Sequence, residues 1–106
     1  MSFRKEKLYV AVIKLAAGTG TIRERLEEAY SLALAALELK DFPEEELKRQ
    51  FLKIHDTLAQ VLPIAERTGH LSLAMDALSE KQIEELAQQV VSLFYRTIQL
   101  EESPGS

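Results

Sequence analysis

The residues best suited to chemistry in this sequence are Arg49 and His55, which lie six positions apart in one helix-patterned segment. An imidazole can exchange a proton near neutral pH, whereas a guanidinium keeps its positive charge. A helical wheel places Arg49 nearly opposite the apolar stripe of the segment and His55 on the flank of that stripe, about 120° away. The ordinary alternative to a catalytic pair is a surface arginine and a histidine at the boundary of the core.

The stretch from Arg49 to His55 resembles the motif of HEPN ribonucleases, in which an arginine precedes a histidine by a similar interval in a small helical bundle. Gln50 matches in kind the polar residue that usually follows that arginine. The resemblance covers these seven residues and the helical fold class. It implies a dimer whose cleft holds the pair, with His55 as acid or base and Arg49 stabilising phosphate charge.

A small glycine loop, Gly18-Thr19-Gly20-Thr21-Ile22-Arg23, enters the N-terminus of a predicted helix. Free N–H groups at a helix N-terminus can bind an anion, so Gly18, Gly20, Thr21 and Arg23 form a candidate phosphate-responsive site. The loop lacks the lysine arrangement of a Walker motif, and Gly-x-Gly alone has low specificity. A tight turn between two helices is the alternative.

Other chemistries have no matching motif in the sequence. The chain has no cysteine, which excludes a disulfide, a thiolate nucleophile and a cysteine zinc site. It also has no Glu-x-x-His pair of the kind that builds di-metal sites in helical bundles. We therefore expect no metal and no cofactor, and the sequence favours a protein that is not an enzyme.

Length and composition indicate one helical domain. The 106 residues are 46% hydrophobic and 28% charged, with four glycines and three prolines. Because no apolar stretch reaches the length of a membrane span and no secretion signal is evident, we expect a cytoplasmic protein, bacterial in origin, without membrane contact. The net charge of −4 and the lack of a basic stripe make nucleic acid a poor partner. The basic residues Arg4, Lys5, Lys7 and Lys14 are expected on a solvated face of the first helix.

Apolar spacing and capping signals predict four helices in a compact all-α bundle. They are expected at about residues 3–17, 22–40, 42–65 and 80–100, with Pro63 kinking or ending the third helix and a short helical turn or ordered connector over 71–78. Caps are expected at Ser2, at Thr21 with Glu24, at Asp41 with Glu44, and at Ser79 with Gln82. Residues 1–100 are predicted to form the domain, and residues 101–106 a flexible tail.

Two helices carry the predicted core most clearly. The first has two neighbouring apolar stripes, one of Leu8, Val12 and Leu15 and the other of Tyr9, Ile13 and Ala16. The last helix is expected to point Ile83, Leu86, Ala87, Val90, Phe94, Thr97 and Ile98 inward.

The run from Tyr30 to Leu39 is apolar almost all the way round, so both of its sides must be covered. We therefore predict a non-catalytic interaction or regulatory module that forms a homodimer or binds a protein partner. Its candidate interface residues are Leu32, Leu34, Leu39, Leu52 and Tyr95. The HEPN-like ribonuclease dimer and the anion-responsive module remain the alternatives.

Overall fold

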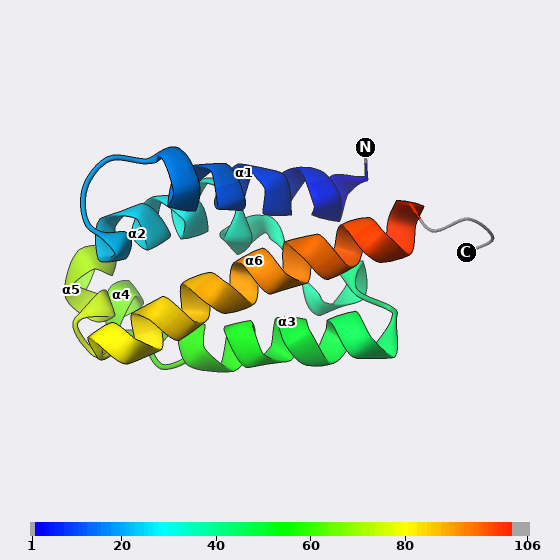
Figure 1. Ribbon diagram of the computed structural model, residues 1–106. Coiled ribbons are helices and arrows are strands. Elements are labelled where there is room, and N and C mark those ends of the chain that lie inside the picture. Colours follow the sequence, from blue (N-terminus) through cyan, green and yellow to red (C-terminus); the bar gives the residue numbers. More distant parts are fainter. Residues whose placement is uncertain (1, 103–106) are drawn as a thin grey trace.

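The computed structural model describes residues 2–102, and every regular element in that range is helical (Figure 1). The elements in order are α1 (Phe3–Ala17), α2 (Ile22–Leu32), the 3₁₀ helices η1 (Leu34–Ala36) and η2 (Leu39–Asp41), α3 (Glu45–Leu58), α4 (Leu62–Thr68), α5 (Leu71–Met75) and α6 (Glu80–Glu102). The prediction of an all-α chain is confirmed. The division into four helices is not, because the second and third predicted helices are each interrupted.

The longest helix, α6, organises the molecule (Figure 1). It runs antiparallel to α1 on one side and packs against α3 on the other, while α4 and α5 lie together at one end. The resulting body measures 47 × 26 × 22 Å. Its fully buried centre draws side chains from α1, α2, α3, α5 and α6 and from the connecting segments, among them Leu8, Leu26, Phe42, Leu47, Met75, Leu86 and Leu93.

The second helix ends at Leu32 rather than near Lys40, because the following residues can be buried only if the chain turns. Ala33 leaves helical geometry, with φ −140° and ψ −57°, and the backbone continues through the two short 3₁₀ helices. A straight helix would carry its apolar residues around its whole circumference. After the break, Ala33, Leu34 and Leu37 all join the core.

The helix caps were predictable from local sequence in three of four cases. The Ser2 hydroxyl accepts from the Lys5 N–H, and reciprocal capping boxes form at Thr21 and Ser79. The Asp41 assignment is wrong. Its carboxylate accepts from the Glu38 N–H at 2.8 Å and so closes η2, while α3 begins one residue after Glu44 without a side-chain cap.

The interruption expected at Pro63 is present. α3 stops at Leu58, and Pro63 lies in the first turn of α4, where its missing N–H costs no hydrogen bond. Gly69 ends α4 in the left-handed conformation, with φ +74°. The helical connector predicted for residues 71–78 is α5, which occupies its first five positions.

The predicted tail begins too early. α6 continues through Glu101 and Glu102, and both carboxylates make ion pairs to α1. Residues 103–106 of the predicted tail lie outside the described residues.

Candidate functional site

The proposed catalytic pair lies on α3, where both side chains are exposed. Six residues of helix separate Arg49 and His55 by about 9 Å along the axis. Within residues 2–102 no hydrogen bond or ion pair joins the two. His55 instead tilts against the Phe51 ring, with ring centroids 6.2 Å apart, and lines an apolar cavity of about 180 Å³ that Arg49 does not reach. A single copy of the chain therefore does not assemble this pair into a site.

The groups of the glycine loop are already bound within the protein. The Thr21 hydroxyl and backbone N–H both donate to the Glu24 carboxylate, which thus occupies the place of an anion at this helix N-terminus. Arg23 pairs with Asp76 at 2.7 Å. Gly20 has φ +95°, and a side chain on Gly18 would meet the Lys14 carbonyl oxygen at 2.4 Å. The geometry is that of a tight turn between helices, in which Arg23, the cation of the predicted site, is already paired with a carboxylate.

The interface residues expected around the second helix do not form one surface. Leu34 is buried in the core, which corrects its assignment as an interface residue, because the chain break turns it inward. Leu32 is exposed among acidic side chains. Leu39 and Leu52 share a shallow depression between η2 and α3, and Tyr95 lies on α6.

A different apolar surface lies along the antiparallel pair of α1 and α6. Its most exposed members, here named the α1/α6 face, are Tyr9 (47%), Ile13 (41%), Val91 (44%) and Tyr95 (62%). An open groove of about 590 Å³ between the helices adjoins Val91 and has no charged side chain in its lining, which consists of Val12, Leu15, Ala16, Ile22, Ala87, Gln88, Val91 and Ser92. Tyr9 contacts Phe94 across the pair, with ring centroids 6.1 Å apart.

The sequence contains a signal for this face, the second apolar stripe of α1, but its periodicity does not say that this stripe is exposed. Tyr9 and Ile13 belong to the second apolar stripe of α1, beside the stripe that contains Leu8 and Leu15. Only the side of α1 with Leu8, Ala11 and Leu15 is buried. Two neighbouring stripes on one helix cannot both face the core of a chain this small, so one of them is left at the surface.

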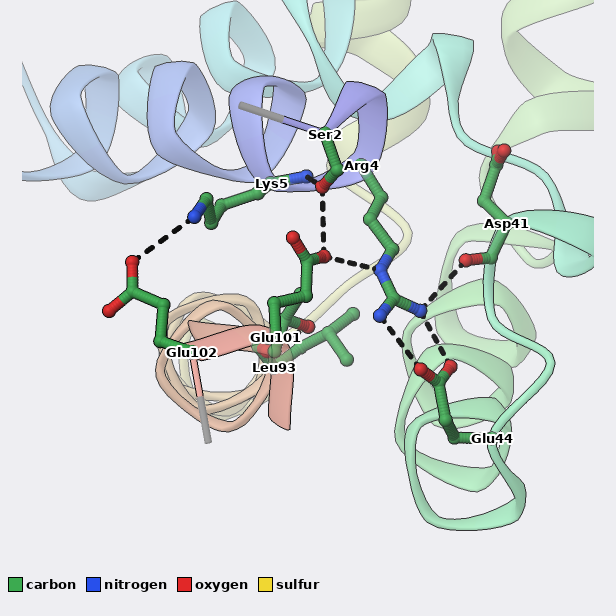
Figure 2. A network of polar contacts seen from close by, with 9 residues as sticks. Ser2, Arg4, Lys5, Asp41, Glu44, Leu93, Glu101 and Glu102 are labelled. Atoms are coloured by element: carbon green, nitrogen blue, oxygen red, sulfur yellow. Dashed lines mark hydrogen bonds and ion pairs between the residues drawn. The ribbon is translucent and has the colours of Figure 1, made fainter. Parts of the chain in front are cut away.

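At one end of the molecule, a network of hydrogen bonds and ion pairs centres on Arg4, and the sequence did not predict it (Figure 2). The Arg4 guanidinium donates to both oxygens of Glu44 at 2.6 and 2.8 Å, to Glu101 at 2.7 Å and to the Asp41 carbonyl oxygen at 3.1 Å. It also lies 5.8 Å from the centre of the Phe42 ring. The expected solvated position of Arg4 is therefore wrong, because its side chain is only 12% exposed.

The network shifts the protonation of its carboxylates. The hydrogen bonds from Arg4 hold the pKa of Glu44 below its ordinary value. Burial by itself raises the pKa of Glu101, but hydrogen bonds from Arg4 and Ser2 outweigh it, so the net pKa is lowered. With its charges paired internally, the network serves to join α1, the start of α3 and the end of α6 rather than to bind a ligand.

Residues 2–102 contain no group of three or more His, Asp or Glu side chains placed to hold a metal ion. In the same range no helix combines the length and apolar character needed to cross a membrane. Comparison of the chain with protein-family models, with curated proteins and with solved structures gave no match.

Proposed function

We propose that this protein is a non-catalytic helical interaction module that pairs with a second copy of itself through the α1/α6 face. The observation that carries the proposal is the presence of four exposed large apolar side chains on one antiparallel helix pair, one of which, Val91, lines the groove between those helices. An apolar patch of this size on a protein surface is often functional, and patches rimmed by polar residues mark sites of protein–protein contact.

The size and composition of the face suit the centre of a protein interface. Four side chains of this size, each about half exposed, present about 400 Å² of surface. Stable interfaces cover about 800 Å² on each partner and surround an apolar centre with polar residues. Gln88 and Ser92 supply such polar neighbours along the groove.

The charge distribution favours a second copy as the partner. The chain carries a net charge of −4, so two copies that met through acidic surfaces would repel each other. A two-fold interface places the same patch opposite itself, and this patch has no formal charge to duplicate. Two antiparallel helices from each copy would then form a four-helix layer, in which aromatic and β-branched side chains interdigitate.

The proposal is tested by measuring mass in solution over a series of concentrations. Light scattering after size exclusion should give twice the chain mass for the wild type. It should give the monomer mass for Val91→Glu and for Tyr95→Glu, because each places a carboxylate in the apolar centre. Leu73→Glu is the matched control, since Leu73 is also half exposed, at 55%, but lies on α5. This control should remain dimeric.

A wild type that stays monomeric at every concentration would overturn the proposal. So would a dimer that both α6 variants leave intact. If Leu39→Asp or Leu52→Asp dissociated the dimer instead, the depression between η2 and α3 would be the interface, in line with the surface expected from the sequence. The proposed dimer does not use α3, so the ribonuclease hypothesis for Arg49 and His55 stays a separate prediction. A cytoplasmic location and a bacterial source also remain predictions.

A further inference from the structure

The cavity beside His55 lies where several helices are interrupted. Its walls come from the end of α2, from η1, from the second half of α3, from the start of α4 and from α6, and comprise Tyr30, Leu34, Ala35, Leu37, Phe51, Ile54, His55, Leu58, Leu62 and Leu93. Because the chain breaks at Ala33 and again after Leu58, no continuous helix fills this corner of the core. The result is about 180 Å³ of space bounded mainly by apolar side chains.

We propose that this cavity binds a small neutral molecule made of one aromatic ring with a hydroxyl group, that is, a simple phenol. A dry apolar cavity of about 150 Å³ is known to hold one benzene molecule, so the space here accommodates one ring with a small substituent. The buried Phe51 ring forms part of the wall and is itself stacked on Phe42, with centroids 4.8 Å apart. A bound ring would therefore lie against an aromatic surface already held in place.

The two polar side chains of the lining indicate the hydroxyl group. Within residues 2–102 the Tyr30 hydroxyl and the His55 ring nitrogens make no hydrogen bond to another protein group. Tyr30 is partly buried and His55 is exposed, so the two polar residues of the lining are also those that solvent reaches, while most of the remaining lining is apolar. Sites for small molecules characteristically combine apolar walls with a few such groups, which fix the orientation of the ligand.

The surroundings disfavour a charged ligand. Among the described residues no Asp, Glu, Lys or Arg lines the cavity, so a carboxylate or an ammonium group would lose its water without gaining a counter-ion. Burial raises the pKa of the Tyr30 phenol, and the negative charge of Glu66 raises it further. A negative ligand group at that rim would be repelled by Glu66. A neutral phenol avoids both costs.

The binding experiment uses the full chain and three probes of similar size: phenol, toluene and benzoate. Amide chemical shifts in ¹H–¹⁵N spectra should change saturably with phenol, with the largest changes at residues of α3 and η1 that line the cavity. Toluene should bind about three- to tenfold more weakly, because it lacks the hydroxyl group. Benzoate should produce no saturable change.

Substitutions in the lining test where phenol binds, and they separate the contribution of the apolar space from that of the hydroxyl contact. Ala35→Phe should weaken phenol binding at least tenfold, because Ala35 lines the cavity at its exposed side. Ala36→Phe is the matched control, since Ala36 is the exposed neighbour in η1 and is not part of the lining. Tyr30→Phe should weaken phenol about three- to tenfold and leave toluene unchanged. Circular dichroism should confirm that each variant keeps its helical content.

The assignment is overturned if phenol causes no saturable shifts, or if Ala35→Phe and Ala36→Phe bind phenol equally well. Equal affinity for phenol, toluene and benzoate would overturn the part of the proposal that concerns the hydroxyl group and neutrality. The inference does not depend on the proposed dimer, because none of the lining residues belongs to the α1/α6 face.

Discussion

Replacement of Arg4 by methionine should destabilise the protein far more than its position near the chain terminus implies. Methionine keeps an apolar stem against Phe42 but removes every hydrogen bond of the guanidinium. The carboxylate of Glu101 is only 17% exposed and would retain the Ser2 hydroxyl as its remaining hydrogen-bond donor. The Asp41 carbonyl oxygen would also lose its donor.

The magnitude follows from the exposure of the partners. Removal of one member of a fully buried ion pair costs about 3–5 kcal/mol, whereas exposed pairs contribute about 0–1 kcal/mol. Arg4 is 12% exposed and Glu101 17%, but Glu44 is 38% exposed and its share is screened by solvent. We therefore expect a loss of about 2–3 kcal/mol in the free energy of unfolding, which corresponds to a fall in Tm of about 10–20 °C.

Urea denaturation followed by circular dichroism at pH 7 measures this loss. The matched control is Lys5→Met, on the next position of α1, which removes an ion pair to Glu102, a side chain that is 62% exposed. This control should cost less than about 1 kcal/mol. If Arg4→Met and Lys5→Met lowered stability equally, the partly buried network would contribute no more than an ordinary surface pair, and the reasoning would be refuted.

Three further outcomes are expected. Because the folded pKa values of Glu44 and Glu101 lie below the ordinary value of 4.5, their contribution to stability is present above that pH and is lost as the pH falls through the folded values. Urea titrations at a series of pH values should therefore show a steeper acid loss in the wild type than in Arg4→Met. Ser79→Ala should cost about 1 kcal/mol in thermal unfolding, because it removes the N-cap of α6. In an RNA cleavage assay, wild type and His55→Ala should both leave the RNA intact if the protein is not catalytic, and cleavage by the wild type alone would support the ribonuclease alternative.

The parts of the fold that could be predicted from the sequence are those that depend on interactions between residues close together in the chain. The caps at Ser2, Thr21 and Ser79 each depend on a hydrogen bond across three positions, which the sequence displays directly. Pro63 interrupts its segment because of its own covalent structure. Asp41 was misassigned because its carboxylate can close either of two adjacent helical turns, and contacts elsewhere decided between them.

The parts that could not be predicted depend on residues far apart in the chain. From the sequence, Arg4 looks like an ordinary solvated charge near the start of a helix. Its ion pair with Glu101 joins residues 97 positions apart and exists only once α6 packs beside α1. The stripe of Tyr9 and Ile13 has the same periodicity as the stripe that is buried, and periodicity alone cannot say which faces the core. Leu34 was predicted at an interface on a continuous helix, but the helix breaks at Ala33 and the break turns the Leu34 side chain into the core.

The break after Leu32 also sets the order in which the structure opens. The chain from Ala33 to Phe42 is held by isolated backbone hydrogen bonds three residues apart, such as that from the Leu37 N–H to the Leu34 carbonyl oxygen, without the continuous ladder of a helix. Segments of this kind open in local fluctuations that leave the rest of the fold intact. Amide protons in this stretch should therefore exchange with solvent before those of α3 and α6. Since Leu34 and Leu37 form one wall of the cavity, the same fluctuation would widen the cavity beyond its open side.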